Sequence, residues 1–170
     1  MSTLYVDTLE PNQNTAITAA AGKLLPVGHV IDHKYMQYGT QINLSTATYT
    51  DTGLTLNITP KSTSSKFIIT YNVFVYVFGV SNQWVAGAGR ILRDSTAIHT
   101  DAYSLGRGAL YNVGGPNAYI MLNSSDTYED EPSTTSQITY KVQFSAYGGR
   151  IIYLNASAQK AFLSVTEIAQ

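Results

Sequence analysis

Residues 53–78 read GLTLNITPKSTSSKFIITYNVFVYVF, and this stretch decides the fold class. In its first part, apolar Leu54, Leu56 and Ile58 alternate with polar residues. Side chains of a strand point to opposite faces in turn, so this alternation predicts a strand with one core face and one polar face. The segment Pro60–Ser65 then holds turn-forming residues. A strand, a turn and a second strand at this spacing are typical of an antiparallel all-β protein.

The second strand of this stretch, Lys66–Phe78, changes character along its length. One face carries only apolar or aromatic residues, at positions 69, 71, 73, 75 and 77. The other face is partly polar at first and becomes apolar at Phe74, Tyr76 and Phe78. A strand that is apolar on both faces needs cover on both, from a loop of its own chain or from a partner subunit. We favour the partner and predict that these three side chains lie at a contact between identical chains.

Similar short stretches, rich in β-branched and aromatic residues, recur along the whole chain, whereas no helical periodicity persists. This pattern predicts an all-β fold, a jelly-roll-like β-sandwich. The expected strands are Val27–Tyr38, Thr46–Thr50, Leu54–Thr59, Lys66–Phe78, Trp84–Arg93, Thr96–Tyr103, Ala118–Leu122, Gln137–Tyr147, Ile151–Leu154 and Ala161–Ile168. The expected turns between them include Asp51–Gly53, Gly79–Gln83, Gly114–Pro116, Glu131–Ser133 and Gly148–Gly149.

The composition is that of a folded chain with few charges. Of the 170 residues, 44% are hydrophobic and only 12% are charged, about half the usual charged share. The net charge of −1 offers no attraction to nucleic acid or to an anionic membrane. The longest apolar run, Val73–Val80, is too short to span a bilayer, and the first residues contain no secretory signal. We therefore expect a protein made in the cytoplasm, with no nucleic-acid partner and no insertion into a membrane.

Residues 1–26 differ from the rest and are expected to form an attachment or stem segment, followed by a head domain at 27–170. They read as two short strands around a turn, and an isolated two-stranded hairpin is marginal in water. The segment must therefore gain its order from the head, from a sister chain or from a larger particle. The alternative is an edge hairpin packed on its own domain. The apolar residues predicted to anchor it are Leu4, Val6, Leu9, Ile17, Leu24 and Leu25.

The search for catalytic and metal-binding patterns yields no assignment. Without cysteine, thiol catalysis and thiolate metal sites are excluded, and no phosphate-loop, serine-hydrolase or zinc-protease motif occurs. His29 and His33 share a face of the expected strand but lack a third ligand. His99 lies two residues from Asp101, as a surface pair would. We predict no catalytic residue, no cofactor and no metal.

The densest group of charges consists of Asp126, Glu129, Asp130 and Glu131, which we expect in one loop. Loops rich in carboxylates can hold calcium, although a solvated loop reads the same way. Whether this loop binds calcium is left open by the sequence.

Two loop regions mix aromatic, glycine and polar residues in a way that suits contact with sugars or protein surfaces. The first runs from Tyr103 to Asn117, and the second from Gly79 to Trp84. Ordinary loops tucked under their neighbours would have a similar composition. The residues predicted to contact a ligand are Trp84, Tyr103, Arg107, Tyr111 and Asn117.

Three stretches resemble bacteriophage tail-fibre and virion-surface modules. The opening, MSTLYVDTLEPNQNTAITAAAGKLLPVGHVI, is similar to the start of short phage fibre-like proteins. Residues 46–73, TATYTDTGLTLNITPKSTSSKFIITYNV, resemble a strand, DTGL, strand, TPKSTSSK, strand pattern of such modules. The end, AFLSVTEIAQ, is similar to their closing strand. The resemblance implies a jelly-roll-like sandwich, a homotrimer, an N-terminal attachment segment and a distal head, and it does not imply an enzyme.

Together, the residues and the resemblance predict a non-enzymatic, homotrimeric structural protein on the surface of a phage virion. Residues 1–26 are expected to bind capsid proteins, as in a decoration or cement protein. The other possibility is that they bind tail proteins, as in a short tail fibre whose head meets a host-surface glycan or protein. The sequence leaves open the capsid or tail role, the host and the glycan. A secreted trimeric lectin or ligand-like protein is the alternative of another class, disfavoured by the missing signal peptide and cysteines.

Overall fold

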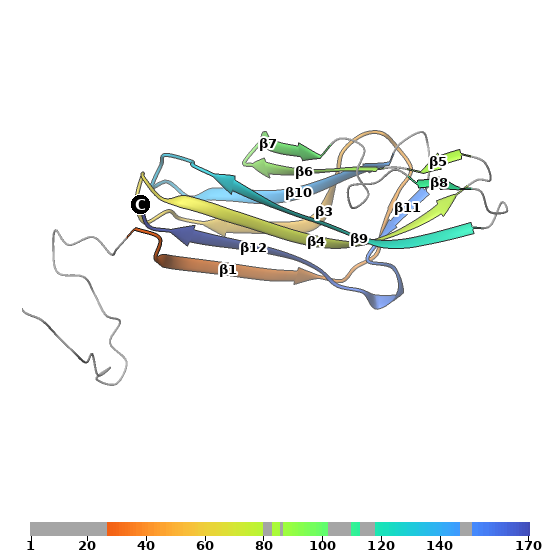
Figure 1. Cartoon of the computed structure of the whole chain (residues 1–170), viewed down its shortest axis with the longest axis horizontal. Helices are drawn as coiled ribbons and strands as arrows, with labels where there is room; N and C mark the ends of the chain where they lie inside the picture. Colours follow the sequence, from red (N-terminus) through yellow and green to blue (C-terminus); the bar gives the residue numbers. More distant parts are fainter. Residues whose placement is uncertain (1–26, 80–82, 86, 102–109, 113–117, 147–150) are drawn as a thin grey trace, which may run out of the picture.

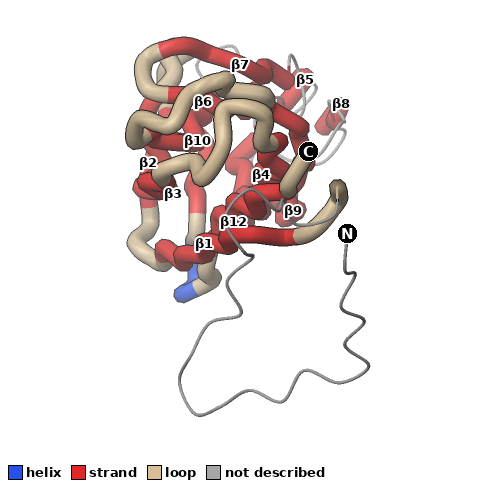
Figure 2. The backbone as a smooth tube through the Cα atoms, turned by 90° about the vertical axis from the view of Figure 1, so that its left-hand side faces the viewer, coloured by secondary structure: helices blue, strands red, loops and turns tan. Residues whose placement is uncertain are grey.

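The computed structural model describes residues 27–79, 83–85, 87–101, 110–112, 118–146 and 151–170. Two antiparallel sheets lie face to face as a sandwich (Figures 1 and 2). The larger sheet contains β1 (Val30–Tyr38), β2 (Ile42–Leu44), β4 (Lys66–Gly79), β9 (Ala118–Asp130), β11 (Ile151–Leu154) and β12 (Ala161–Ile168). The smaller sheet contains β3 (Thr50–Ile58), β6 (Gly87–Arg93), β7 (Thr96–Asp101) and β10 (Ile138–Ala146). A ribbon of β5 (Gln83–Val85) and β8 (Leu110–Asn112) and a 3-10 turn, η2 (Ala156–Ala158), complete the described elements.

The order of pairing is that of a jelly roll. Antiparallel pairs form between β1 and β12, β3 and β10, β4 and β9, and β6 and β7. These pairs are nested in the sequence, so the chain amounts to one long hairpin that has rolled up. Rolling places alternate pairs in opposite sheets, which gives the orders β1-β12-β4-β9 and β3-β10-β6-β7. The prediction of an all-β sandwich of jelly-roll type is confirmed at the level of the single chain.

Strand β4 is the centre of the larger sheet. Along one side it pairs with β9 over its whole length, and along the other it pairs first with β12 and then with β11. Its odd-numbered residues from Phe67 to Val77 are 0–1% exposed and form the core with β10. The ring of Tyr71 packs edge-on against Phe144, with centroids 6.1 Å apart. Its even-numbered residues from 68 to 78 are half-buried, so the two unlike faces predicted from the alternation are confirmed.

The turn expected at Asp51–Gly53 is wrong, because these residues lie inside β3. Thr55 pairs with Lys141 and Asp51 with Gln143, so β3 carries extra residues between these two pairs and bulges there. Gly53 has a φ of +80°, which a glycine adopts without strain. Thr52 holds the bulge in place, since its hydroxyl donates to the carbonyl oxygen of Val142 at 2.8 Å.

Three other boundaries differ from those expected. Only Thr50 of the segment Thr46–Thr50 is in a strand, and the short strand β2 was not predicted. The single strand expected at Trp84–Arg93 is two strands, β5 and β6. Strand β9 does not end at Leu122 but continues to Asp130, because β4 offers a paired residue at every position up to Phe67. No helix within the described ranges has the length and apolar character needed to cross a membrane.

Candidate functional site

The outward face of the larger sheet gathers uncharged and aromatic side chains. Residues directly opposite each other on paired strands point to the same face. Phe78 pairs with Ile151 on β11, whereas Tyr76 lies between Tyr153 on β11 and Met121 on β9. With Phe74, which the alternation along β4 adds, we call this set the aromatic patch: Phe74, Tyr76, Phe78, Met121, Ile151 and Tyr153.

The aromatic patch is partly exposed. Met121 is 65% and Ile151 is 39% exposed, and the other four side chains are half-buried. The rings of Tyr76 and Tyr153 meet at 62° with centroids 5.8 Å apart. The structure therefore brings together on one surface the three residues of β4 for which the sequence predicted a contact with a sister chain. Contiguous apolar surface of this kind is a common mark of an interaction site.

A hollow of about 380 Å³ opens within the aromatic patch. None of the side chains that line it is charged at neutral pH, so a group that fills it would be uncharged. The lining residues are Gln41, Tyr76, Met121, Tyr153, Ala156 and Ser157.

The hollow is bounded on one side by an unusual turn that follows β11. Asn155, Ser157 and Ala158 have φ values of 57°, 58° and 60°. A non-glycine residue in this left-handed region costs about 1–2 kcal/mol, and such strain is often found at functional sites. The backbone N–H of Asn155 donates to the carbonyl oxygen of Phe74 at 2.9 Å, which ties the turn to the centre of β4. The turn thereby fixes Ala156 and Ser157 at the rim of the hollow.

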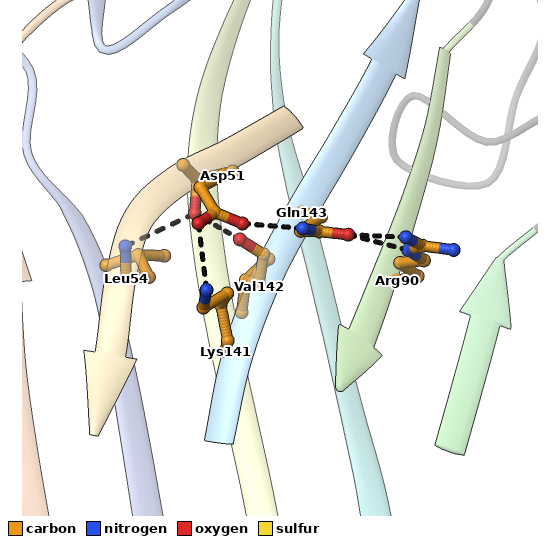
Figure 3. A network of polar contacts seen from close by, with 7 residues as sticks. Asp51, Leu54, Arg90, Lys141, Val142 and Gln143 are labelled. Atoms are coloured by element: carbon orange, nitrogen blue, oxygen red, sulfur yellow. Dashed lines mark hydrogen bonds and ion pairs between the residues drawn. The ribbon is translucent and has the colours of Figure 1, made fainter. Parts of the chain in front are cut away.

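The outward face of the smaller sheet is different in kind, because a network of polar side chains covers it (Figure 3). Asp51 accepts hydrogen bonds from Lys141 at 2.8 Å and from Gln143 at 2.5 Å. The Gln143 side-chain oxygen in turn accepts from Arg90, whose guanidinium lies 4.1 Å from the ring centre of Tyr49. This face of the sandwich therefore suits water, whereas the aromatic patch of the other face holds no charged side chain.

The network also alters the acidity of Asp51. Partial burial raises the pKa of this carboxyl, but the hydrogen bonds from Lys141 and Gln143 and the charges of Lys141 and Arg90 outweigh burial. The pKa of Asp51 is consequently held below its ordinary value of 3.8. The carboxylate stays ionised at neutral pH and keeps this face hydrated.

The acidic residues expected in a calcium-binding loop lie instead on β9 and on both of its faces. Asp126 and Asp130 point inward and are each 8% exposed. Asp130 binds Arg93 at 2.8 Å, and Asp126 Oδ2 lies 2.6 Å from His99 Nε2. These contacts join β9 to strands β6 and β7 of the other sheet, so their role is structural.

Glu129, on the outer face of β9, and Glu131, just beyond its end, both bind Lys66, at 2.8 and 2.9 Å. The four carboxylates therefore do not converge on one point. No group of three His, Cys, Asp or Glu side chains suited to a metal ion occurs among the residues described. The expectation that these residues share one loop is wrong, because β9 extends through this segment and separates their side chains.

The histidines also differ from expectation. A bulge between Val30 and Asp32 breaks the even spacing that predicted a shared face for His29 and His33. The His33 ring nitrogen Nδ1 lies 2.9 Å from the Thr166 hydroxyl oxygen, and His99 is bound to Asp126. The sequence suggested Asp101, on the same strand, as the partner of His99, whereas the described partner, Asp126, lies on β9.

Other residues singled out by the sequence lie where the structure describes little. Trp84 and Tyr111 are paired with each other across the β5–β8 ribbon, at the end of the sandwich remote from β1's start (Figure 1). Outside the described residues lie Tyr103, Arg107 and Asn117 and the anchor residues Leu4, Val6, Leu9, Ile17, Leu24 and Leu25.

Three members of the aromatic patch were not predicted, namely Met121, Ile151 and Tyr153. A signal for two of them was present, since Ile151 and Tyr153 alternate with Ile152 and Leu154 in an expected strand. Both alternating pairs are apolar or aromatic, as on β4. The same signal marks Met121, because both alternating sets of the expected strand Ala118–Leu122 are also apolar or aromatic, and its pairing with Tyr76 brings it into the patch.

Comparisons with known proteins found no family model and no curated protein that matches this chain. Among solved structures, the VP2 subviral particle of infectious bursal disease virus is similar over 91% of this chain, with 12% identity and a TM-score of 0.36. The structure of the Gx strain of the same virus gives 12% identity and a TM-score of 0.33 over 91% of this chain. This chain spans only 43% of either of those chains. Similarity this distant leaves the function to be argued from the residues themselves.

Proposed function

We propose that this chain is a non-enzymatic structural protein of a phage virion surface, which assembles as a homotrimer through the outward face of its larger sheet. The segment 1–26 contains the residues that attach it to capsid proteins, as in a decoration protein, or to tail proteins. The observation that carries the proposal is the contrast between the aromatic patch on the larger sheet and the polar network on the smaller sheet. A partly exposed aromatic patch of this kind is typical of a surface that meets another protein.

The occupant we assign to the aromatic patch is a second copy of the chain. The patch and its hollow hold no charged side chain, and an uncharged surface is best covered by another uncharged surface. The aromatic patch of a second copy is such a surface, and the polar network of the smaller sheet is not. Three copies around an axis would bury the aromatic patches and leave the three polar faces in water.

The ends of the sandwich fit attachment at one side and display at the other. The Gly28 N–H donates to the carbonyl oxygen of Ala169 at 2.9 Å, and the Ala169 N–H donates to the carbonyl oxygen of His29 at 2.8 Å. The described chain therefore begins and ends at one tip of the sandwich, and the β5–β8 ribbon lies toward the other tip (Figure 1). An attachment through residues 1–26 would direct the ribbon, with Trp84 and Tyr111, away from the particle.

The non-enzymatic role is supported by how the inward carboxylates are used. Asp130 binds Arg93 and Tyr140, and Asp126 binds His99. A general acid or base must be able to reach a substrate proton, whereas these groups hold the two sheets together.

Sedimentation equilibrium of the full chain at micromolar concentration tests the assembly. We expect a mass three times that of the 18.5 kDa chain. A stable monomer under these conditions would overturn the proposal. Electron microscopy of particles lacking the protein then separates the two attachments: lost capsid projections indicate capsid decoration, whereas intact heads with failed adsorption indicate a tail role.

A further inference from the structure

Among the described strands, one edge of the sandwich has no bulge and is long. Among the strands described, β1 and β3 carry bulges, the pairing of β7 with β6 is shifted between Ile91 and Leu92, and β2 has only three residues. Strand β9 pairs with β4 over 13 consecutive positions without a shift, and no described strand pairs with its other side. Long and regular edge strands are templates for pairing with another strand, and bulges and short length are the usual protection.

We propose that the open edge of β9 accepts the segment Thr3–Leu9 of a sister copy as an added strand. This inference rests on the proposed homotrimer and names a contact that holds it together. The main chain of the added segment would form backbone hydrogen bonds with the open edge of β9. Its side chains would decide which face of the segment turns toward the core, as in other cases of strand addition.

The backbone groups of β9 point the right way for this addition. The Thr127 N–H donates to Asp126 Oδ1 at 2.7 Å, so it points away from β4. Backbone groups alternate in direction along a strand, and the N–H groups of Met121, Asn123 and Ser125 therefore also point to the open edge. The donor of Thr127 is thus satisfied by the carboxylate of its neighbour Asp126. Within the described ranges, no strand pairs with the outer side of residues 121 to 125, where an added strand would bond.

The side chains beside this edge suit an alternating strand. Leu122 on β9 and Ile98 on β7 are partly buried and pack at the border of the core. In the segment Thr3–Leu9, Leu4 and Val6 would fall on one face and Asp7 on the other. A strand added with Leu4 and Val6 inward would cover Leu122 and Ile98 and place Asp7 in water.

The geometry of the sheet favours a sister copy over the same chain as the source of the segment. Residue 27 leads into β1, and β1 and β9 are opposite edges of the larger sheet. In a ring of copies, the contact is heterologous, so the β1 side of one copy lies next to the β9 side of the following copy. Residues 10–26 can span up to about 56 Å when extended, and the distance along β9 from Asp130 to Met121 is only about 30 Å. The connection is therefore long enough for Thr3–Leu9 to lie along β9 of a neighbouring copy.

Disulfide trapping tests the pairing directly, because the natural chain has no cysteine. A copy carrying Asp7→Cys is co-expressed with a differently tagged copy carrying Asn123→Cys or Ser125→Cys, and the mixture is oxidised mildly. We expect a disulfide between the two differently tagged copies. The matched control replaces the β9 cysteine by Thr55→Cys, which is equally exposed but lies on β3, and should give none.

A proline pair provides the second test. Ser125→Pro removes an N–H that faces the open edge, so the head should fold while the trimer dissociates roughly tenfold more readily. Ser124→Pro removes an N–H that bonds to β4, and should instead destabilise the head itself.

The outcomes are distinct. Any one of three results overturns the inference. The first is that no disulfide forms at 123 or 125, and the second is that a disulfide forms only within a single chain carrying both cysteines. The third is a Ser125→Pro trimer that is as stable as the natural one. If sedimentation still shows a trimer in that case, the proposed function stands and only the strand pairing is lost. A monomer throughout removes both.

Discussion

Tyr140 donates a hydrogen bond of 2.7 Å from its hydroxyl to Asp130 Oδ2 across the interior of the sandwich. The same carboxylate accepts from Arg93 at 2.8 and 3.0 Å. Asp130 belongs to β9 of the larger sheet, whereas both donors belong to the smaller sheet. One buried carboxylate therefore fixes the spacing of the two sheets at this end of the core.

Replacing Asp130 by alanine should destabilise the fold by about 3 kcal/mol, because it leaves the Arg93 charge and the buried Tyr140 hydroxyl without their acceptor. Urea unfolding followed by circular dichroism measures this loss. Asp130→Asn is the control, since it retains one acceptor oxygen and should lose less. A loss below about 1 kcal/mol for the alanine variant would show that the contact contributes little.

The same pair predicts a dependence of stability on alkaline pH. Burial, followed by the hydrogen bond to Asp130 and its negative charge, raises the pKa of Tyr140 above its ordinary value of 10.0. The unfolded chain then loses this proton at a lower pH than the folded chain. The stability from Tyr140 is complete below pH 10 and declines as the pH rises above that value. Urea midpoints of the natural chain and of Tyr140→Phe, compared between neutral and alkaline pH, isolate the contribution of Tyr140. We expect the urea midpoint to fall less steeply with pH in the variant.

Gly53 is the glycine on which the β3 bulge depends. A Cβ atom at this position would lie 2.5 Å from the ring of Tyr38, and the φ of +80° is unfavourable for any other residue. Gly53→Ala should therefore cost about 2 kcal/mol or more in the free energy of unfolding. The double variant Gly53→Ala, Tyr38→Ala tests the cause, because removing the ring should relieve the clash and leave only the backbone strain. If the loss of the double variant equalled the sum of the losses of Gly53→Ala and Tyr38→Ala, the clash would not be the main cause.

The alternation of β3 and β4 could be predicted from the sequence because a strand with one buried face shows its period directly in residue type. The second half of β9, residues 123–130, could not, since its inward residues include Ser124, Asp126 and Asp130, which read as loop residues. Burial of the two carboxylates is tolerated because His99 binds Asp126 and Arg93 binds Asp130 from strands distant in the sequence. A polar core residue satisfied from the opposite sheet leaves no local signal.

The candidate site was predictable only along single strands. Phe74, Tyr76 and Phe78 stood out because both faces of β4 become apolar, and this is a property of one segment. The patch as a surface depends on register, which places Met121 and Tyr153 on either side of Tyr76. Register follows from the bulges and turns of the whole sheet, and periodicity within one strand does not encode it.

A charge placed on the aromatic patch should separate the copies without unfolding them. Met121 is 65% exposed, so Met121→Glu leaves the core of each head intact, but burial at the proposed interface would strip water from the new carboxylate. We expect the trimer to weaken by roughly tenfold or more, about 1.4 kcal/mol per factor of ten, in sedimentation equilibrium. Thr55→Glu on the smaller sheet is the matched control, because Thr55 faces water beside the Asp51 network and should tolerate the charge. Assembly that is equally strong in both variants would mean that the aromatic patch is not where the copies meet.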